Sequence, residues 1–529
     1  MTHDLPWWRG AVFYQIYPRS YLDTNHDGVG DLKGITAKLD YVASLGVEGI
    51  WISPCFKSPM KDFGYDVSDY RDIDPMFGSL ADFDALLAKA HSLGLKIIVD
   101  LVLSHTSEQH PWFIESRKNK TNSKADWYVW SDGKEGGLPN NWVSCFGGPA
   151  WTFDEGRGQY YLHNFLKEQP DLNFHNPEVQ DEILDTAKFW LDRGIDGFRL
   201  DVVNFYFHDQ SLRDNPPRTH GTTFATQFEK PDPYSEQQHI HDKSQPENLV
   251  FLERLRKLMD EYPGTMTLGE IGDDHPYERA AEYTAGYTRL NTAYNTHMMG
   301  GKHKKVTPGF IREPISEFLR QPTVSWPSWA FSNHDVVRVA SRWQPGGDGF
   351  TADPAQAKML IALLCSLRGT AFLYQGEELG LPEAQIPYEK IQDPWGKHTW
   401  PDWQGRDGCR TPMPWNSERH AGFSTAEPWL PVPDTHLNLT VEKQEQDKHS
   451  VLSFVREFLR WRKDQSALRH GDIRFHDAGH PDVLAFLRET ESQSVFCAFN
   501  LGDTDAEITD LHGASISLPP FGFSIKDID

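Results

Sequence analysis

The segment KIIVDLVLSH at residues 96–105 is an apolar run, rich in β-branched residues, that ends in Ser104 and His105. Such a run predicts a buried β-strand with polar side chains at its carboxyl end. Seven further runs of this kind occur along the chain, and longer amphipathic stretches typical of helices separate most of them. The eight runs lie at residues 12–18, 47–54, 96–105, 196–204, 266–272, 290–296, 328–335 and 369–380.

The stretches between these runs complete a repeating strand–helix pattern. Eight strands that alternate with helices predict an α/β fold, a (β/α)8 TIM barrel. A doubly wound open sheet gives a similar alternation, so the periodicity alone leaves both architectures open. The clearest amphipathic stretches lie at residues 32–45, 79–93, 178–193 and 247–261.

Two intervals and the tail depart from this pattern. Roughly ninety residues, rich in Trp, Asn, Gly and Pro, separate the third strand from the fourth, which is far beyond an ordinary loop and predicts an inserted subdomain. A polar, Pro-rich stretch at 205–248 predicts a flexible excursion over the same barrel face. After a helix at 451–463, short alternating strands at 483–488, 494–500 and 514–519 predict a C-terminal all-β domain. The expected divisions are the first part of the barrel at 1–105, the inserted subdomain B at 106–174, the second part of the barrel at 175–465 and the β domain at 466–529.

Composition narrows the class of partner. The 529 residues include 52 Lys and Arg against 76 Asp and Glu, a net charge of -24 that disfavours nucleic acid and anionic membranes as partners. No apolar run approaches the ~18 residues of a membrane helix, and we find no signal peptide, so we expect a cytoplasmic protein. The five cysteines lack the spacing of a zinc site or a disulfide framework and are expected to be reduced.

Polar residues stand at the ends of four of the predicted strands. Because the carboxyl ends of barrel strands meet at one rim, where such folds carry their active sites, we expect these side chains to converge. A single strand-end acid is more often a helix cap, but chance rarely places the whole set at this rim. The residues are Asp100 and His105 on the third strand, Arg199 and Asp201 on the fourth, Glu270 on the fifth, and His334 and Asp335 on the seventh.

Paired carboxylates in a pocket are what glycosidic bond cleavage requires. One carboxylate attacks the anomeric carbon, and the other, with a raised pKa, protonates the leaving oxygen. Arg199 stands two residues before Asp201 on a strand and therefore points to the same face. It can hold Asp201 in place and keep it ionised.

These strand ends resemble the motifs of glycoside hydrolase family thirteen, the α-amylase family. QPDLN at 169–173 resembles the signature of its oligo-1,6-glucosidase and α-glucosidase branch. The likeness extends over nearly the whole chain, from the N-terminal WWRGAVFYQIYPRSY to the β tail. The motifs that carry it are the DxxxxH segment at 100–105, GFRLD at 197–201, GE at 269–270, SNHD at 332–335, YQGEELG at 374–380 and GRDGCRTPMPW at 405–415.

The resemblance implies roles for the residues of the rim. Asp201 would be the nucleophile, Glu270 the general acid/base and Asp335 the stabiliser of the transition state. His105 and His334 would form hydrogen bonds with sugar hydroxyls. The reaction would be a double displacement with retention of the α configuration.

The resemblance also implies how the substrate is held. Asp62 of DFGYD and Arg406 of GRDGCR would grip the non-reducing end and close the pocket, and Tyr65 would stack on the terminal glucose. Phe146 and Phe165 are candidates for the pocket wall, with ordinary core packing as the alternative.

The implied activity is that of an exo-acting retaining α-glucosidase. It would release α-glucose from short maltose- or isomaltose-type α-glucosides and transfer glucosyl groups to sugar or alcohol acceptors, as a monomer or homodimer. The alternative is mainly an α-glucosyltransferase or a sugar isomerase with the same covalent intermediate. The RLDRD motif associated with sucrose isomerases is absent, and a non-catalytic binding subunit would have lost the catalytic acids. In this branch Val202, directly after the nucleophile, goes with α-1,6 activity, and Thr or Ala there with α-1,4 activity.

A metal loop is predicted near the N-terminus. DTNHDGVGD at 23–31 places oxygen donors at positions 1, 3, 5 and 9 of an EF-hand-like loop and Gly at position 6, but position 12 is Gly34 instead of Glu. An Asx-rich turn without an ion is the alternative. Members of the branch carry a similar loop with Ca²⁺ or Mg²⁺, which would be structural here, and no organic cofactor is expected. Ser104 stands where many family members have an Asn that binds a different calcium, so that second ion is not expected. The predicted ligands are Asp23, Asn25, Asp27, Val29 and Asp31.

Overall fold

The computed structural model describes residues 5–219, 233–295, 297–300, 305–321, 325–344 and 349–528. Its centre is an eight-stranded sheet with the order β11-β10-β9-β5-β2-β1-β13-β12, in which neighbouring strands run parallel. The end strands β11 and β12 lie against each other, so the sheet forms a nearly closed barrel. The strands are β1 (Val12–Ile16), β2 (Gly49–Ile52), β5 (Lys96–Leu101), β9 (Gly197–Leu200), β10 (Met266–Ile271), β11 (Thr292–Asn295), β12 (Ser328–Ala330) and β13 (Thr370–Tyr374).

This closure confirms the predicted barrel and excludes the open sheet. The strands are buried because helices cover their outer faces, as expected for parallel strands with continuous apolar runs. The stretch at 32–45, predicted as one helix, is two helices that meet at Lys38, whose φ of -103° and ψ of 6° interrupt the helical geometry. The helices around the barrel are α1 (Leu32–Ala37), α2 (Leu39–Leu45), α3 (Leu80–Ser92), α5 (Pro177–Asp192), α6 (Glu247–Asp260), α7 (Pro276–Tyr283), α8 (Pro308–Arg320), α9 (Val339–Arg342) and α10 (Pro354–Ser366).

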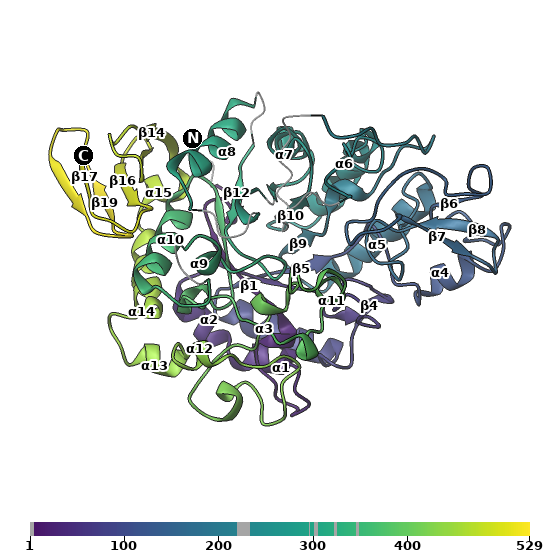
Figure 1. Cartoon of the computed structure of the whole chain (residues 1–529), viewed down its shortest axis with the longest axis horizontal. Helices are drawn as coiled ribbons and strands as arrows, with labels where there is room; N and C mark the ends of the chain where they lie inside the picture. The colour runs from purple at the N-terminus through teal and green to yellow at the C-terminus, as the bar shows by residue number, and fades with distance from the viewer. Residues whose placement is uncertain are drawn as a thin grey trace.

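The interval between β5 and α5 has a sheet and a core of its own. It contains α4 (Pro111–Ser116) and the antiparallel strands β6 (Trp130–Ser131), β7 (Trp151–Asp154) and β8 (Gln159–Leu162), in the order β6-β8-β7. Figure 1 shows this unit at the right-hand end of the molecule, away from the barrel strands. Its core is formed by Val129, Trp142, Ala150, Trp151 and Leu162.

The excursion predicted at 205–248 is described except for residues 220–232, which lie outside the described part. The segment before this gap packs on the inserted subdomain. Trp142 Nε1 donates to the carbonyl of Arg213 at 2.9 Å, and Asn141 Nδ2 donates to that of Asn215 at 2.8 Å. The excursion and the subdomain therefore lie on the same face of the barrel.

The C-terminal part is an antiparallel β domain, as predicted. After α14 (Val451–Arg462) and α15 (Ser466–His470), four strands pair in the order β14-β15-β16-β19, and β17 pairs with β18. Figure 1 shows this domain at the left-hand end. The predicted strands at 483–488, 494–500 and 514–519 are present, whereas three others were not predicted. The bounds are β14 (Asp472–His476), β15 (Val483–Glu489), β16 (Ser494–Asn500), β17 (Ala506–Thr509), β18 (Ser515–Leu518) and β19 (Phe523–Asp527).

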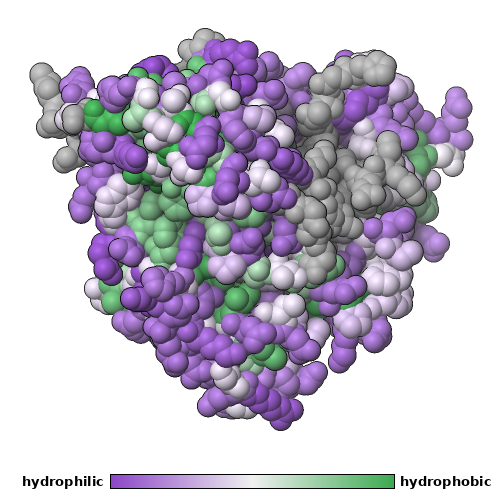
Figure 2. All heavy atoms as spheres, turned by 60° about the vertical axis from the view of Figure 1, so that its left-hand side comes forward, coloured by the Kyte–Doolittle hydropathy of each residue, from purple (hydrophilic) through white to green (hydrophobic). Residues whose placement is uncertain are grey.

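The surface is consistent with the acidic composition. The face in Figure 2 is mostly hydrophilic, with hydrophobic residues in small patches between polar ones. Within the described ranges, no helix has both the length and the apolar character that a bilayer span needs.

Short elements after β2 and β13 complete the fold, and Asp62, Tyr65 and Arg406 of the candidate site lie in the loops beside them. These elements are β3 (Phe56–Lys57), β4 (Asp69–Ile73), α11 (Pro394–Thr399), α12 (Asp434–Leu437) and α13 (Val441–Glu445).

Candidate active site

Arg199 connects the buried acids at the carboxyl end of the barrel. The register of β5 and β9 places Asp100 beside Arg199, and their side chains are 2.8 Å apart. Nη1 also donates to Asp201 Oδ1 at 2.6 Å, and Nη2 donates to Glu270 Oε2 at 2.5 Å. The guanidinium is fully buried and lies over the ring of Trp51. Because it pairs with three carboxylates, its positive charge neutralises part of their negative charge.

Burial and Arg199 act in opposite directions on the pKa values of Asp201 and Glu270. Burial raises the pKa of Asp201 to about 7, while Arg199 favours its charged form. Burial likewise raises the pKa of Glu270 to about 7. The negative charges of Asp201 and Asp335 raise this pKa further, whereas the positive charge of Arg199 lowers it. Carboxylates so placed hold a proton near neutral pH, which suits acid catalysis by one member of the pair.

Asp335 differs from these two acids. Burial alone would raise its pKa, but the His334 ring, which is protonated only at low pH, and the guanidinium groups of Arg410 and Arg406 hold the pKa of Asp335 far below its ordinary value. Oδ1 accepts from Arg410 Nη2 at 2.7 Å and from Arg406 Nη1 at 3.3 Å. Asp335 is therefore a permanent negative charge at the rim.

His334 is neutral and has one defined tautomer. Burial lowers its pKa to about 3. The amide of Gln15 lies 2.8 Å from Nδ1, and since an amide nitrogen only donates, the ring proton is assigned to Nε2. Nε2 faces Tyr65 Oη at 2.5 Å and Asp335 Oδ2 at 3.1 Å, and Tyr65 Oη donates onward to Asp100 at 3.0 Å. The rings of Tyr65 and His334 stack at 5.3 Å.

His105 lies on the other side of Tyr65. Its Nε2 is 3.0 Å from the carbonyl of Tyr65 and 3.1 Å from Gln169 Nε2, and its Nδ1 is 2.8 Å from Ser104 Oγ. Burial lowers the pKa of His105 to about 4, so the ring is neutral at pH 7. The ring of Phe165 lies 5.2 Å away.

Asp62 and Arg406 form a buried ion pair across 344 residues of chain. Arg406 Nη2 donates to Asp62 Oδ1 at 2.7 Å and to Asp393 Oδ1 at 2.8 Å. The guanidinium carbon lies 5.2 Å from the ring centre of Phe146, whose ring in turn lies 5.9 Å from that of Phe165. The loops after β2 and β13 thus meet at this pair, and Phe146 of subdomain B packs against it, so that the three segments form one wall.

Val202 has a strained backbone. Its φ of 35° and ψ of 52° lie in the left-handed region, which a β-branched residue rarely adopts. This turn directs the Val202 N–H toward Glu270 Oε2 at 3.3 Å. The side chain is half-buried beside Asp201.

The contacts above link all eleven residues that the sequence predicts for catalysis and substrate binding. Several further groups of this network were not predicted as site residues, among them Gln169, Arg410, Asp393 and Tyr294. Gln169 lies within the QPDLN motif and Arg410 within the GRDGCR motif, so motif position could have pointed to both. Asp393 and Tyr294, which contacts Arg199 at 3.1 Å, have no local sequence signal.

The loop at 23–31 folds as a series of Asx turns. Asp23 Oδ1 accepts from Asn25 N at 3.0 Å, Asn25 Oδ1 from Asp27 N at 3.1 Å, and Asp27 Oδ1 from Val29 N at 2.8 Å. Asp31 instead caps α1 by accepting from Gly34 N at 2.7 Å.

Hard oxygen donors wound in this way fit Ca²⁺ or Mg²⁺. Gly28, at position 6, has a φ of +90°, and a Cβ there would lie 2.2 Å from the carbonyl of Glu427, so the tight turn requires glycine. In the described ranges no cluster of three or more His, Cys, Asp or Glu side chains forms a metal site, so Asn25 and the Val29 carbonyl would have to contribute.

Comparisons with known proteins agree with this geometry. A family model described as alpha amylase, catalytic domain, matches residues 15–471. The chain is 54% identical to a probable alpha-glucosidase of Rhizobium meliloti strain 1021, over 95% of this chain and 91% of the relative. It is 38% identical to an oligo-1,6-glucosidase of Heyndrickxia coagulans, over 94% and 92%.

Two solved structures are similar over nearly their full length. The alpha-glucosyl transfer enzyme XgtA has a TM-score of 0.94 and 52% identity, with 99% of both chains covered. The trehalulose synthase MutB from Pseudomonas mesoacidophila MX-45 has a TM-score of 0.90 and 32% identity, covering 99% of this chain and 100% of the other.

Proposed function

The chain belongs to the α-amylase family, and from this premise we propose that it is an exo-acting, retaining α-glucosidase that acts on short α-glucosides and also transfers glucosyl groups. One observation carries the proposal: two buried carboxylates, Asp201 and Glu270, bind the same guanidinium. This shared cation keeps them close together, as a retaining mechanism with carboxyl groups roughly 5–5.5 Å apart requires. Relatives named alpha-glucosidase and oligo-1,6-glucosidase support the same reading.

The first step forms a covalent glucosyl ester. Asp201 attacks the anomeric carbon, and Glu270 gives its proton to the departing glycosidic oxygen. The raised pKa of Glu270 supplies that proton near neutral pH. Arg199 holds the attacking carboxylate, and the fixed negative charge of Asp335 stabilises the cationic character of the transition state.

The second step reverses this chemistry. Glu270, now ionised, takes a proton from water or from an acceptor hydroxyl, whose oxygen attacks the anomeric carbon and releases Asp201. Two inversions give the α product. Water yields glucose, and a sugar or alcohol yields a new glucoside.

The buried Asp62–Arg406 pair supports action at a chain end. It closes the pocket at the point where a second sugar unit would otherwise extend beyond the non-reducing glucose. His105, His334 and Tyr65 would contact the hydroxyls and the face of that glucose, with Phe146 and Phe165 forming the wall.

A predominantly transferring enzyme is the second candidate, favoured by the 52% identity to the alpha-glucosyl transfer enzyme XgtA. Time-resolved proton NMR with equal maltose and isomaltose tests both candidates. Early α-glucose is the result expected of a hydrolase. New glucosyl linkages that outpace free glucose would establish the transferase, and turnover unchanged in Asp201→Asn would overturn both.

The loop at 23–31 supports a structural cation as a further proposal. The ligands of Ca²⁺ or Mg²⁺ would be Asp23, Asn25, Asp27, the Val29 carbonyl and Asp31. The ion would connect β1 to α1, and glycosyl transfer itself needs no metal.

We also propose that the protein is cytoplasmic, since all five cysteines are free thiols, and that it is a monomer or homodimer.

A further inference from the structure

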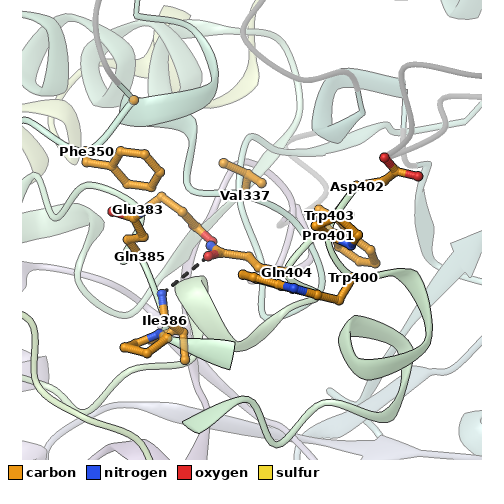
Figure 3. Close-up of a pocket in the computed structure, with 12 residues that line it drawn as sticks. Val337, Phe350, Glu383, Gln385, Ile386, Trp400, Pro401, Asp402, Trp403 and Gln404 are labelled. Atoms are coloured by element: carbon orange, nitrogen blue, oxygen red, sulfur yellow. Dashed lines mark hydrogen bonds between the residues drawn. The ribbon is translucent and has the colours of Figure 1, made fainter. Parts of the chain in front are cut away.

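A second cavity lies between the loop after β12 and the loop after β13. It has a volume of about 450 Å³, which is within the range of small-molecule sites. Figure 3 shows Phe350 on one side of it, the group formed by Trp400, Pro401 and Trp403 on the other, and Val337 between them. None of the sequence-predicted site residues lines this cavity.

The cavity nevertheless adjoins the wall of the catalytic pocket. Val337 stands two residues after Asp335, and Gln404 two residues before Arg406, so each pair of Cα atoms is at most ~7.6 Å apart. Trp403 packs edge-on against Trp395 at 4.7 Å.

Its rim combines an exposed aromatic surface with free polar groups. Trp400 is 42% exposed, and its ring lies 5.3 Å from that of Tyr388, which is 52% exposed. Gln385 and Asp402 are also exposed, and within the described ranges their side chains form no hydrogen bond to the protein. Trp400 of the lining thus presents an exposed ring face beside two exposed polar side chains, and all three are accessible to a ligand in the cavity.

The charge of the lining selects among ligand classes. Among the described residues that line it, the ionisable members are Glu383 and Asp402, and none is Lys, Arg or His. Anionic ligands such as phosphosugars are therefore disfavoured. A neutral pyranoside offers a C–H face for the indole and hydroxyls for the amide and carboxylate.

We propose that this cavity is a second binding site for a neutral saccharide, separate from the catalytic pocket. The ring stacks on Trp400, and its hydroxyls bind Gln385 and Asp402. Gln404 forms the floor, where it accepts from Ile386 N at 3.3 Å, as the dashed line in Figure 3 marks.

Fluorine NMR of full-length Asp201→Asn protein labelled with 5-fluorotryptophan tests this site. The Trp400 signal, identified by its loss in Trp400→Phe, should shift with maltose and saturate in the millimolar range, about the weakest affinity of a specific site. Trp461, an equally exposed tryptophan on α14, is the matched control and should not shift.

Two polar substitutions distinguish this cavity from the catalytic pocket. Gln385→Ala and Asp402→Ala should each raise the Kd for maltose, measured at the Trp400 signal, about fivefold. This factor corresponds to the loss of one hydrogen bond. In the active enzyme, both should leave KM for an aryl α-glucoside unchanged. No shift at Trp400, or a shift insensitive to both substitutions, would overturn the proposal. Residual turnover of maltose by Asp201→Asn would count against the proposed function instead, not against this site.

Discussion

Arg199 Nη2 lies 2.5 Å from Glu270 Oε2, on the same guanidinium whose Nη1 lies 2.6 Å from Asp201 Oδ1. The two carboxylates therefore share one buried cation, and the charge of each affects the proton affinity of the other. Such a pair loses its protons in two macroscopic steps, and the state with one proton is the catalytically competent one.

This coupling predicts a bell-shaped pH profile of kcat/KM for an aryl α-glucoside. Burial raises the pKa of both Asp201 and Glu270 to about 7. The rate should fall on the acid side as Asp201 gains a proton and on the alkaline side as Glu270 loses its own. With an activated leaving group, which needs no acid, Glu270→Gln should abolish the alkaline limb. An alkaline limb that persists in this variant would assign the acid to another residue.

Val202 provides a test of linkage preference. Val202→Thr keeps the β-branched shape at a backbone φ of 35° but places a hydroxyl beside Asp201. We expect the ratio of kcat/KM for maltose over isomaltose to rise about tenfold, the scale of one altered pocket contact. Val202→Ala is the companion variant and should change the ratio in the same direction. If neither variant changes it, other loops determine the linkage.

Metal removal should affect stability more than catalysis. EDTA should lower the melting temperature by a few degrees, because a ligand bound only to the folded state stabilises it, while activity at low temperature changes little. Asp27→Ala should melt at the lower temperature with or without EDTA, since its carboxylate is one of the proposed ligands. Identical melting curves of the wild-type protein in EDTA and in Ca²⁺ would argue against a bound ion.

Asp171 should make stability depend on pH. Burial raises its pKa to about 8, while its Oδ2 accepts from Asn164 N at 3.2 Å. The folded-state pKa lies above the unfolded value of about 3.9, so the contribution to stability is fully present below that value and is lost as pH rises to about 8. In Asp171→Asn this position cannot ionise, so the decrease in stability with rising pH is removed. The melting temperature of this variant relative to wild type should climb between pH 5 and pH 8 and level off above; a difference independent of pH would contradict the assignment.

The strands and several helices of the barrel were predictable because their signals are local. Apolar β-branched runs indicated all eight strands, and four amphipathic stretches indicated α1, α2, α3, α5 and α6, whereas α7 to α10 were not predicted. Closure of the barrel depends on contacts between β11 and β12 that periodicity does not encode. In the C-terminal domain, β14 and β19 escaped prediction because both are half-exposed and mix polar with apolar residues. The alternating strand β17 is only four residues long.

Some contacts of the candidate site could likewise be predicted from the sequence, and others could not. A two-residue spacing on one strand predicts that Arg199 reaches Asp201, and it does so at 2.6 Å. The contact of Arg199 with Glu270 depends on the neighbouring strand, and that of Asp393 with Arg406 on a loop that folds back. These contacts are long-range consequences of the fold, so motifs alone do not specify them.

Trapping the covalent intermediate would show directly whether Asp201 is the nucleophile. The wild-type enzyme should be treated with a slow donor such as 5-fluoro-α-glucosyl fluoride, digested with protease and analysed by peptide mass spectrometry, with Asp201→Asn as the control. We expect one fluoroglucosyl group per chain, carried by the peptide that contains Asp201 and absent from the control. An adduct on another residue, or β-glucose as the first product of maltose, would contradict it.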